Sequence, residues 1–149
     1  MIIRDILNLK GSTLFSIGPK GKVSEAVSVM VKHDIGSLVV MEKGRMTGIL
    51  TFREVLKALD AQQGNLNDLQ VGKVMVRDPI CGNPDDTLEH LREVMTQNHI
   101  RYLPVKDGEQ LLGVISFHDV AKAVIKETRF ENRLLKRYIK NWPEEESAK

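Results

Sequence analysis

Apolar side chains recur along the chain with two different spacings, which predict an alternation of helices and strands. Residues 23–32 carry apolar side chains three and four positions apart, the spacing of an amphipathic helix. Residues 37–41 and 46–50 are short apolar runs joined by a polar, glycine-containing turn, which predicts a hairpin. A second helical pattern begins at Thr51 and reaches residue 59, so a hairpin between two helices is expected.

The second half of the chain shows the same order of elements. Thr87 begins a helical pattern, residues 102–105 and 111–115 form another apolar hairpin, and Ser116 begins the next helix. Short elements are expected before the first helix of each half. In the first half they are a turn or helix at residues 1–9 and a strand at 14–17, and in the second half a short strand is expected at Ile80 and Cys81. Each half thus reads strand, helix, strand, strand, helix.

The two halves are copies of one unit. At an offset of 65, residues 29–60 overlay residues 94–125 without a gap, and ten pairs are identical, where roughly two are expected by chance. Upstream the offset becomes 68, and it pairs Ile3, Ile6 and Leu7 with Val71, Val74 and Met75. A unit used twice buries its sheet properly only against its copy. We therefore expect an α+β or α/β fold with a pseudo-twofold axis.

Composition excludes several classes of protein. The 149 residues, 42% hydrophobic and 28% charged, suit one globular domain. A net charge of +2 makes nucleic acid an improbable partner, and no apolar run approaches the length of about 20 residues that spans a membrane. The lone Cys81 excludes an internal disulfide, and the N-terminus lacks a signal-peptide pattern. A cytoplasmic location is expected.

Two residues at the start of the last helix form a candidate ligand site. Ser116 and Asp119 are three residues apart, so both can face one ligand across the first helical turn. An ionised carboxylate can accept hydrogen bonds from two vicinal hydroxyls, and a helix N-terminus suits a phosphate. His118 and Arg53 add possible positive charge, and the small Gly36 would let a base approach the backbone.

This order of elements, with glycine, two apolar residues, Ser/Thr and an acid three positions later, resembles the cystathionine-β-synthase (CBS) domain. The resemblance covers residues from about 3 to 127. It rests on the run from Gly113 to Asp119, on the run from Ile100 to Val105 before an Asp-Gly turn, and on their copies in the first half. Small stand-alone bacterial CBS-pair proteins are similar in further details, namely Lys10-Gly11, Glu131-Asn132 and Tyr138-Ile139.

The resemblance implies a regulatory ligand-binding module and no enzyme, with an adenine nucleotide such as AMP, ATP or NAD between the repeats. No metal or catalytic cofactor is implied. In the family the acid holds the ribose and the Ser/Thr lies near the phosphate. The Asp119 site comprises Ser12, Phe15, Ile35, Gly36, Ser37, Ser116, His118 and Asp119. The second, weaker Glu54 site comprises Thr51, Arg53, Glu54, Ile80, Ile100, Arg101 and Tyr102.

The Glu54 site departs from the family pattern. Glu54 replaces the aspartate, and its extra methylene moves the carboxylate by about one C–C bond. Arg101 and Tyr102 are bulky and would fill the cleft, unless Arg101 grips a phosphate. Both acid motifs also have a plain alternative as helix caps, and Thr51-x-x-Glu54 has the sequence of a capping box. The alternative function is a structural or dimerisation module whose clefts bind nothing.

Five segments are expected in the chain: repeat 1 (1–60), a linker (61–70), repeat 2 (71–127), an amphipathic helix (128–142) and a disordered tail (143–149). The tail helix places Phe130, Leu134 and Tyr138 among basic residues, and no third repeat exists to cover them. A second subunit is the expected partner, so a homodimer is predicted. A further protein partner is expected but not identified, and a membrane surface or nucleic acid is the lesser alternative for this helix.

Overall fold

The computed structural model describes residues 1–11 and 13–139. The first half contains α1 (Ile3–Lys10), β1 (Ser16–Ile17), α2 (Val23–His33), β2 (Ser37–Glu42), β3 (Arg45–Thr51) and α3 (Phe52–Ala61). The second half contains η1 (Val71–Lys73), β4 (Val76–Arg77), α4 (Leu88–Gln97), β5 (Tyr102–Asp107), β6 (Gln110–Ser116) and α5 (Phe117–Tyr138). Both predicted hairpins and the helices that flank them are confirmed.

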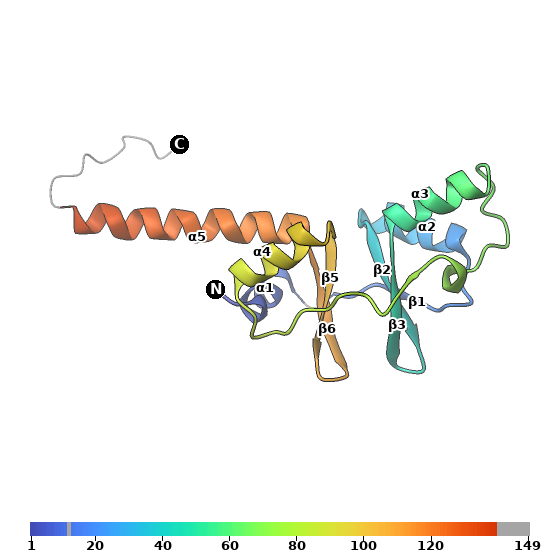
Figure 1. The fold of residues 1–149 in the computed structure, drawn as a ribbon, viewed down its shortest axis with the longest axis horizontal. Coiled ribbons are helices and arrows are strands. Elements are labelled where there is room, and N and C mark those ends of the chain that lie inside the picture. Colours follow the sequence, from blue (N-terminus) through green and yellow to red (C-terminus); the bar gives the residue numbers. More distant parts are fainter. Residues whose placement is uncertain (12, 140–149) are drawn as a thin grey trace.

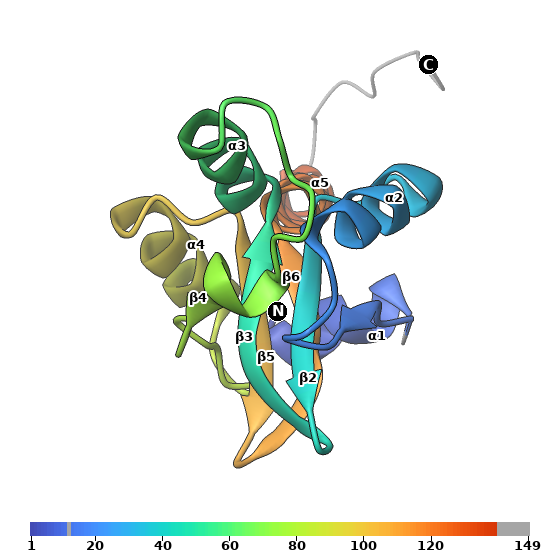
Figure 2. The same ribbon diagram turned by 90° about the vertical axis from the view of Figure 1, so that its right-hand side faces the viewer.

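Two small sheets stand side by side at the centre of the molecule, with the helices around them (Figures 1 and 2). In the first sheet β1 runs parallel to β2, β2 and β3 form the antiparallel hairpin, and β4 pairs with the far edge of β3. The second sheet is the antiparallel hairpin of β5 and β6. Both hairpins have an irregularity at the same place, after Val40 in β2 and after Val105 in β5, as expected of two copies of one unit.

The strand predicted at Ile80 and Cys81 is wrong. Neither residue is in a strand, and the β-structure near them consists of β4 upstream and one bridge from Gly82 to Val105. Gly82 donates from its backbone nitrogen to the Pro104 carbonyl at 2.8 Å. The apolar pair follows Pro79, which has no amide hydrogen, and Asp78, whose φ of 46° bends the chain. Two apolar residues that directly follow such a bend are too short a run to form a strand ladder.

The segments that lead into the repeats are exchanged between them. Ile3 and Ile6 of α1 are buried in the core of the second repeat, beside Leu91 of α4. Val71 and Met75 are buried in the core of the first repeat, where the Val71 nitrogen also donates to the Gly21 carbonyl at 2.8 Å. The register at an offset of 68 therefore pairs segments with equivalent places on opposite repeats.

α5 continues as one helix from the second repeat into the tail and extends away from the sheets (Figure 1). Val120 and Ala123 in its first turns are buried, whereas Phe130 and Leu134 are 56% and 40% exposed. The helix ends at Tyr138, four residues before the expected end at residue 142, and the expected disordered tail lies outside the described residues. Within the part of the chain that is described, no helix has both the length and the apolarity needed to cross a bilayer.

Candidate functional site

The hairpins bring the starts of α3 and α5 to equivalent places in the two repeats. The Phe52 nitrogen donates to the Gly36 carbonyl at 2.9 Å, and the Phe117 nitrogen donates to the Arg101 carbonyl at 2.8 Å. Each bond ties the start of a helix to the residue before the first hairpin strand of the same repeat. The two predicted sites therefore share one backbone frame and differ in their side chains.

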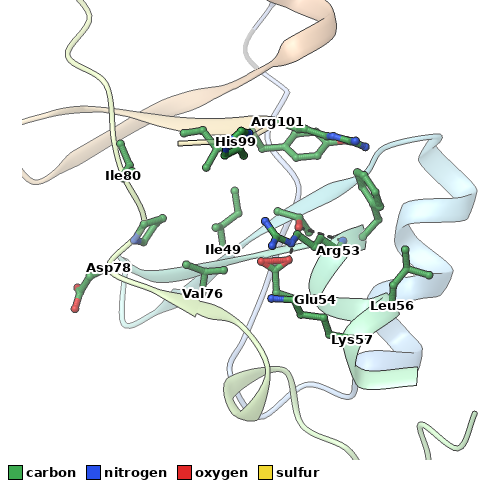
Figure 3. A pocket seen from close by; sticks show the side chains of 15 residues that line it. Ile49, Arg53, Glu54, Leu56, Lys57, Val76, Asp78, Ile80, His99 and Arg101 are labelled. Atoms are coloured by element: carbon green, nitrogen blue, oxygen red, sulfur yellow. Dashed lines mark hydrogen bonds between the residues drawn. The ribbon is translucent and has the colours of Figure 1, made fainter. Parts of the chain in front are cut away.

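A cavity of about 670 Å³ lies at the Glu54 site, between the start of α3, β4 and the segment before β5 (Figure 3). All seven residues predicted for this site line it. Sequence reasoning missed the other lining residues, which are Ile49, Phe52, Leu56, Lys57, Val76, Asp78, Pro79 and His99. Val76 and Asp78 reach the cavity because β4 pairs with β3. The sequence carried no sufficient signal for them, because the register at an offset of 68 makes residues 71–75 equivalent to the N-terminal helix but does not say against which repeat either segment packs.

The cavity combines an apolar wall with charged groups. Ile49, Val76 and Ile80 lie on one side in Figure 3, and the α3 wall carries Glu54 and Arg53. The charged lining groups are Arg53, Lys57 and Arg101, against the carboxylates of Glu54 and Asp78. Such a site can cover a flat apolar group and hold an anionic one at the same time.

The start of α3 is capped differently from the sequence expectation. Thr51 accepts a hydrogen bond from the Arg53 nitrogen at 3.3 Å, and its hydroxyl donates to the carboxylate of Glu54. These bonds do not form the capping box that the sequence of Thr51 and Glu54 allows, because the Glu54 carboxylate accepts from the Thr51 hydroxyl. Because Glu54 has one methylene more than aspartate, its carboxylate reaches the hydroxyl of its own turn. It faces the cavity from there.

Arg101 and Tyr102 stand in the cavity wall and leave the cavity open. The Arg101 guanidinium lies 5.3 Å from the centroid of the Phe52 ring, and Phe52 meets Tyr102 edge to face at 6.2 Å. The hydroxyl of Tyr102 reaches Gly36, where a Cβ would lie only 2.0 Å from it. Burial raises the pKa of Tyr102, Arg101 opposes this rise, and the charge of Asp119 adds to it. Tyr102 thus lies between the two sites.

At the Asp119 site the carboxylate already has partners within the chain. Asp119 Oδ2 accepts from Lys10 Nζ at 2.7 Å and from the Ser116 nitrogen at 2.8 Å. The Ser116 hydroxyl accepts from the Asp119 nitrogen at 3.1 Å, so this turn forms a capping box. Burial disfavours the charged form of Asp119, but the bonds from Lys10 and Ser116 outweigh it and lower the pKa of the carboxyl.

The remaining residues of the Asp119 site are only partly brought together. Phe15 stacks on His33 with ring centroids 4.1 Å apart, and His118 is exposed. Ile35 packs on the first core, and Ser37 pairs with Thr51 in the hairpin. Ser12 lies outside the described residues. Sequence reasoning missed Lys10 as a site residue, although Lys10-Gly11 stood out in the sequence.

Comparison with known proteins identifies the repeats. The family model described as "CBS domain" matches residues 3–61 and 71–126. The CBS domain-containing protein YhcV of Bacillus subtilis is 32% identical over 119 residues, which are 80% of this chain and 82% of YhcV.

Solved structures agree with the family match. The CBS-domain protein ATU1752 of Agrobacterium tumefaciens is 31% identical, with a TM-score of 0.79 over 83% of this chain and 98% of that one. The CBS pair of protein MJ0100, solved with 5′-methylthioadenosine and S-adenosyl-L-methionine, has the same fold at 23% identity and a TM-score of 0.73, over 85% and 98% of the two chains. The chain described here belongs to the CBS domain family and carries two CBS domains in tandem.

Proposed function

We propose that this CBS pair is a regulatory module, and no enzyme, that binds one adenine nucleotide of the AMP, ATP or NAD type in the cavity at the Glu54 site. The observation that carries the proposal is the lining of this cavity, where an apolar wall faces a carboxylate at a helix start and two arginines. The MJ0100 pair, which shares the fold, was solved with two adenosine derivatives, and this supports the same class of ligand.

Each part of an adenine nucleotide has a matching group in the lining. The base would lie among Ile49, Val76 and Ile80, which have no polar side-chain group to leave unsatisfied. The ribose hydroxyls would donate to Glu54, the ionisable acceptor at the start of α3. Phosphates would lie near the guanidinium groups of Arg53 and Arg101, whose planar donors suit phosphate oxygens.

The test is isothermal titration with AMP, ADP, ATP, NAD, S-adenosylmethionine and 5′-methylthioadenosine, beside Glu54→Gln. This variant keeps an acceptor for Thr51 and removes the charge. We expect binding to weaken about 10- to 100-fold, because a hydrogen bond to a charged group contributes about 1.5–3 kcal/mol. The matched control is Asp60→Asn, an acid on α3 that does not line the cavity. Equal loss in both variants, or no loss in Glu54→Gln, would refute the ribose role.

A binding-free structural module is the second candidate, and the ion pair between Lys10 and Asp119 favours it because that carboxylate needs no ligand. If none of the six compounds binds folded protein at millimolar concentration, this second candidate replaces the first. We propose a cytoplasmic location, since the chain carries a thiol and no disulfide partner.

We further propose that the module is a homodimer that acts through its dimer geometry or on a protein partner. The apolar side chains of α5 beyond the second repeat support self-association, since Phe130, Leu134 and Leu135 are all at least 40% exposed. Light scattering behind size exclusion tests this: Leu134→Glu should lower the measured mass to that of one chain. Lys122→Glu, on the same helix, serves as the charge-changing control.

A further inference from the structure

The carboxylate of Asp119 is bound by a cation of the same chain. Lys10 Nζ lies 2.7 Å from Asp119 Oδ2 and also donates to the Val114 carbonyl at 2.7 Å. The two side chains are 35% and 15% exposed, so the pair is sheltered on the carboxylate side. The bonds from Lys10 and from the Ser116 nitrogen both end on Oδ2, so a ribose whose two vicinal hydroxyls donate to the two carboxylate oxygens would have to displace the ammonium and replace its charge-assisted hydrogen bond with a neutral one.

The position of Lys10 is determined by the packing of α1. Ile3 and Ile6 are 1% and 4% exposed in the core of the second repeat, which fixes α1 against that repeat. Leu7 then packs against β6, with its Cδ2 3.0 Å from where a Cβ on Gly113 would lie. Lys10 is the last residue of α1, so the packing of this helix holds the ammonium of Lys10 beside Asp119.

The equivalent position in the other repeat carries the opposite charge. The register that pairs Ile3 with Val71 also pairs Lys10 with Asp78. Asp78 lines the cavity, and in Figure 3 its carboxylate points away from that of Glu54. Two carboxylates cannot form the pair that Lys10 and Asp119 form. Glu54 accepts instead from the neutral hydroxyl of Thr51.

Tyr102 adds a second obstruction on the Asp119 side. Its hydroxyl occupies the space beside Gly36, the small residue that would otherwise let a base approach the backbone. The residue equivalent to Tyr102 in the first repeat is Ser37, and the one equivalent to Gly36 is Arg101. The bulky Tyr102 of the second repeat therefore lies against the small Gly36 of the first.

We infer that Lys10 determines how many nucleotides the pair binds: its ammonium takes the place of the ribose hydroxyls on Asp119, so that the chain binds one nucleotide, beside Glu54, and not two. The inference rests on the proposed function for the class of ligand. Removing the ammonium frees an ionised acceptor at a helix start, which suits the vicinal hydroxyls of a nucleoside. The affinity of the Asp119 site should then rise about 10- to 100-fold.

The experiment measures AMP bound per chain by equilibrium dialysis and locates it by amide chemical shifts. Wild type is compared with Lys10→Met, which keeps the length of the side chain, and with Lys10→Arg, which keeps the charge. Lys22→Met is the matched control, because Lys22 pairs with Asp68 at 3.8 Å on an exposed surface. Asp119→Asn added to Lys10→Met shows whether a new site uses that carboxylate. The stoichiometry of wild type tests the inference even if Lys10→Met does not fold.

The outcomes separate this inference from the proposed function. The inference and the proposed function are both supported if wild type, Lys10→Arg and Lys22→Met each bind one AMP, and if Lys10→Met binds a second AMP that Asp119→Asn removes. No AMP in wild type and one in Lys10→Met that Asp119→Asn removes refutes binding at the Glu54 site and upholds the role of Lys10. Two AMP in wild type, an AMP in wild type that maps to Asp119, or equal numbers in wild type and Lys10→Met, zero included, overturns the inference.

Discussion

Gly48 and Gly113 occupy the same position in the two repeats, and replacing each with alanine should have unequal effects. A Cβ on Gly48 would lie 2.4 Å from the Val76 carbonyl oxygen and 3.0 Å from the sulfur of Met75. A Cβ on Gly113 would meet only the end of the Leu7 side chain, at 3.0 Å. A flexible side chain can move by a few tenths of an ångström, but a paired backbone cannot do so without loss of pairing.

The magnitude follows from what must move. Gly48→Ala forces β4 away from β3, where they pair at Gly48 with Arg77 and at Ile49 with Val76. Overpacking costs about 1–3 kcal/mol and each lost hydrogen bond about 1 kcal/mol, so a destabilisation of about 3 kcal/mol is expected. Gly113→Ala should stay within about 1 kcal/mol of wild type, because lower chain entropy in the unfolded state offsets the small contact.

Urea unfolding followed by circular dichroism measures both variants, with melting temperature as a second readout. A cost of about 3 kcal/mol corresponds to a decrease of roughly 6–12 °C for a chain of this size. Gly48→Ala should also lower the affinity of the cavity for any ligand, because Val76 of β4 lines the cavity. Gly48→Ala within about 0.5 kcal/mol of wild type, or an equal cost in Gly113→Ala, would refute the close approach of β3 and β4.

Three further predictions concern single side chains. The pKa of Asp119 is lowered from 3.8, so its contribution to the free energy of unfolding is complete above that pH and is lost as the pH falls through the lower folded value; denaturation of wild type and Asp119→Asn should differ at pH 6 and converge in acid. Leu50→Ala, at a fully buried position, should cost about 2–5 kcal/mol, whereas Val31→Ala, at a position 76% exposed, should change stability by less than about 0.5 kcal/mol in the same assay. Burial raises the pKa of the Cys81 thiol, and Lys106 opposes the rise only in part, so iodoacetamide should label Cys81 faster in unfolded than in folded protein at pH 7.

The sequence predicted what depends on local patterns. Period and turn residues were enough to place both hairpins and the helices that follow Thr51 and Ser116, because those signals lie within each element. The prediction of a strand at Ile80 and Cys81 failed because two apolar residues are too few to show a hydrophobic period, and the residues before them bend the chain. α5 runs as one helix through the end of the second repeat and the tail, which the sequence pattern predicts as two segments, because no helix-breaking residue separates them.

The sites required contacts that no local pattern encodes. All residues of the Glu54 site lie around one cavity, but its other wall comes from β4, whose pairing with β3 joins the two repeats. At the Asp119 site, which the sequence favoured, the decisive contact joins residues 109 positions apart. That Lys10 meets Asp119 follows from the exchange of lead-in segments, which sequence similarity between the repeats could not reveal.

That exchange has a consequence for how the molecule holds together. The core of each repeat is completed by a segment that precedes the other repeat in the chain, much as arms are exchanged in a swapped dimer. A cut in residues 61–69, between the repeats, would leave each fragment with the piece that its partner lacks. The two fragments should therefore reassociate without the connecting peptide, whereas either fragment alone would expose an unfilled core. The chain is in this respect a heterodimer whose subunits happen to be covalently joined.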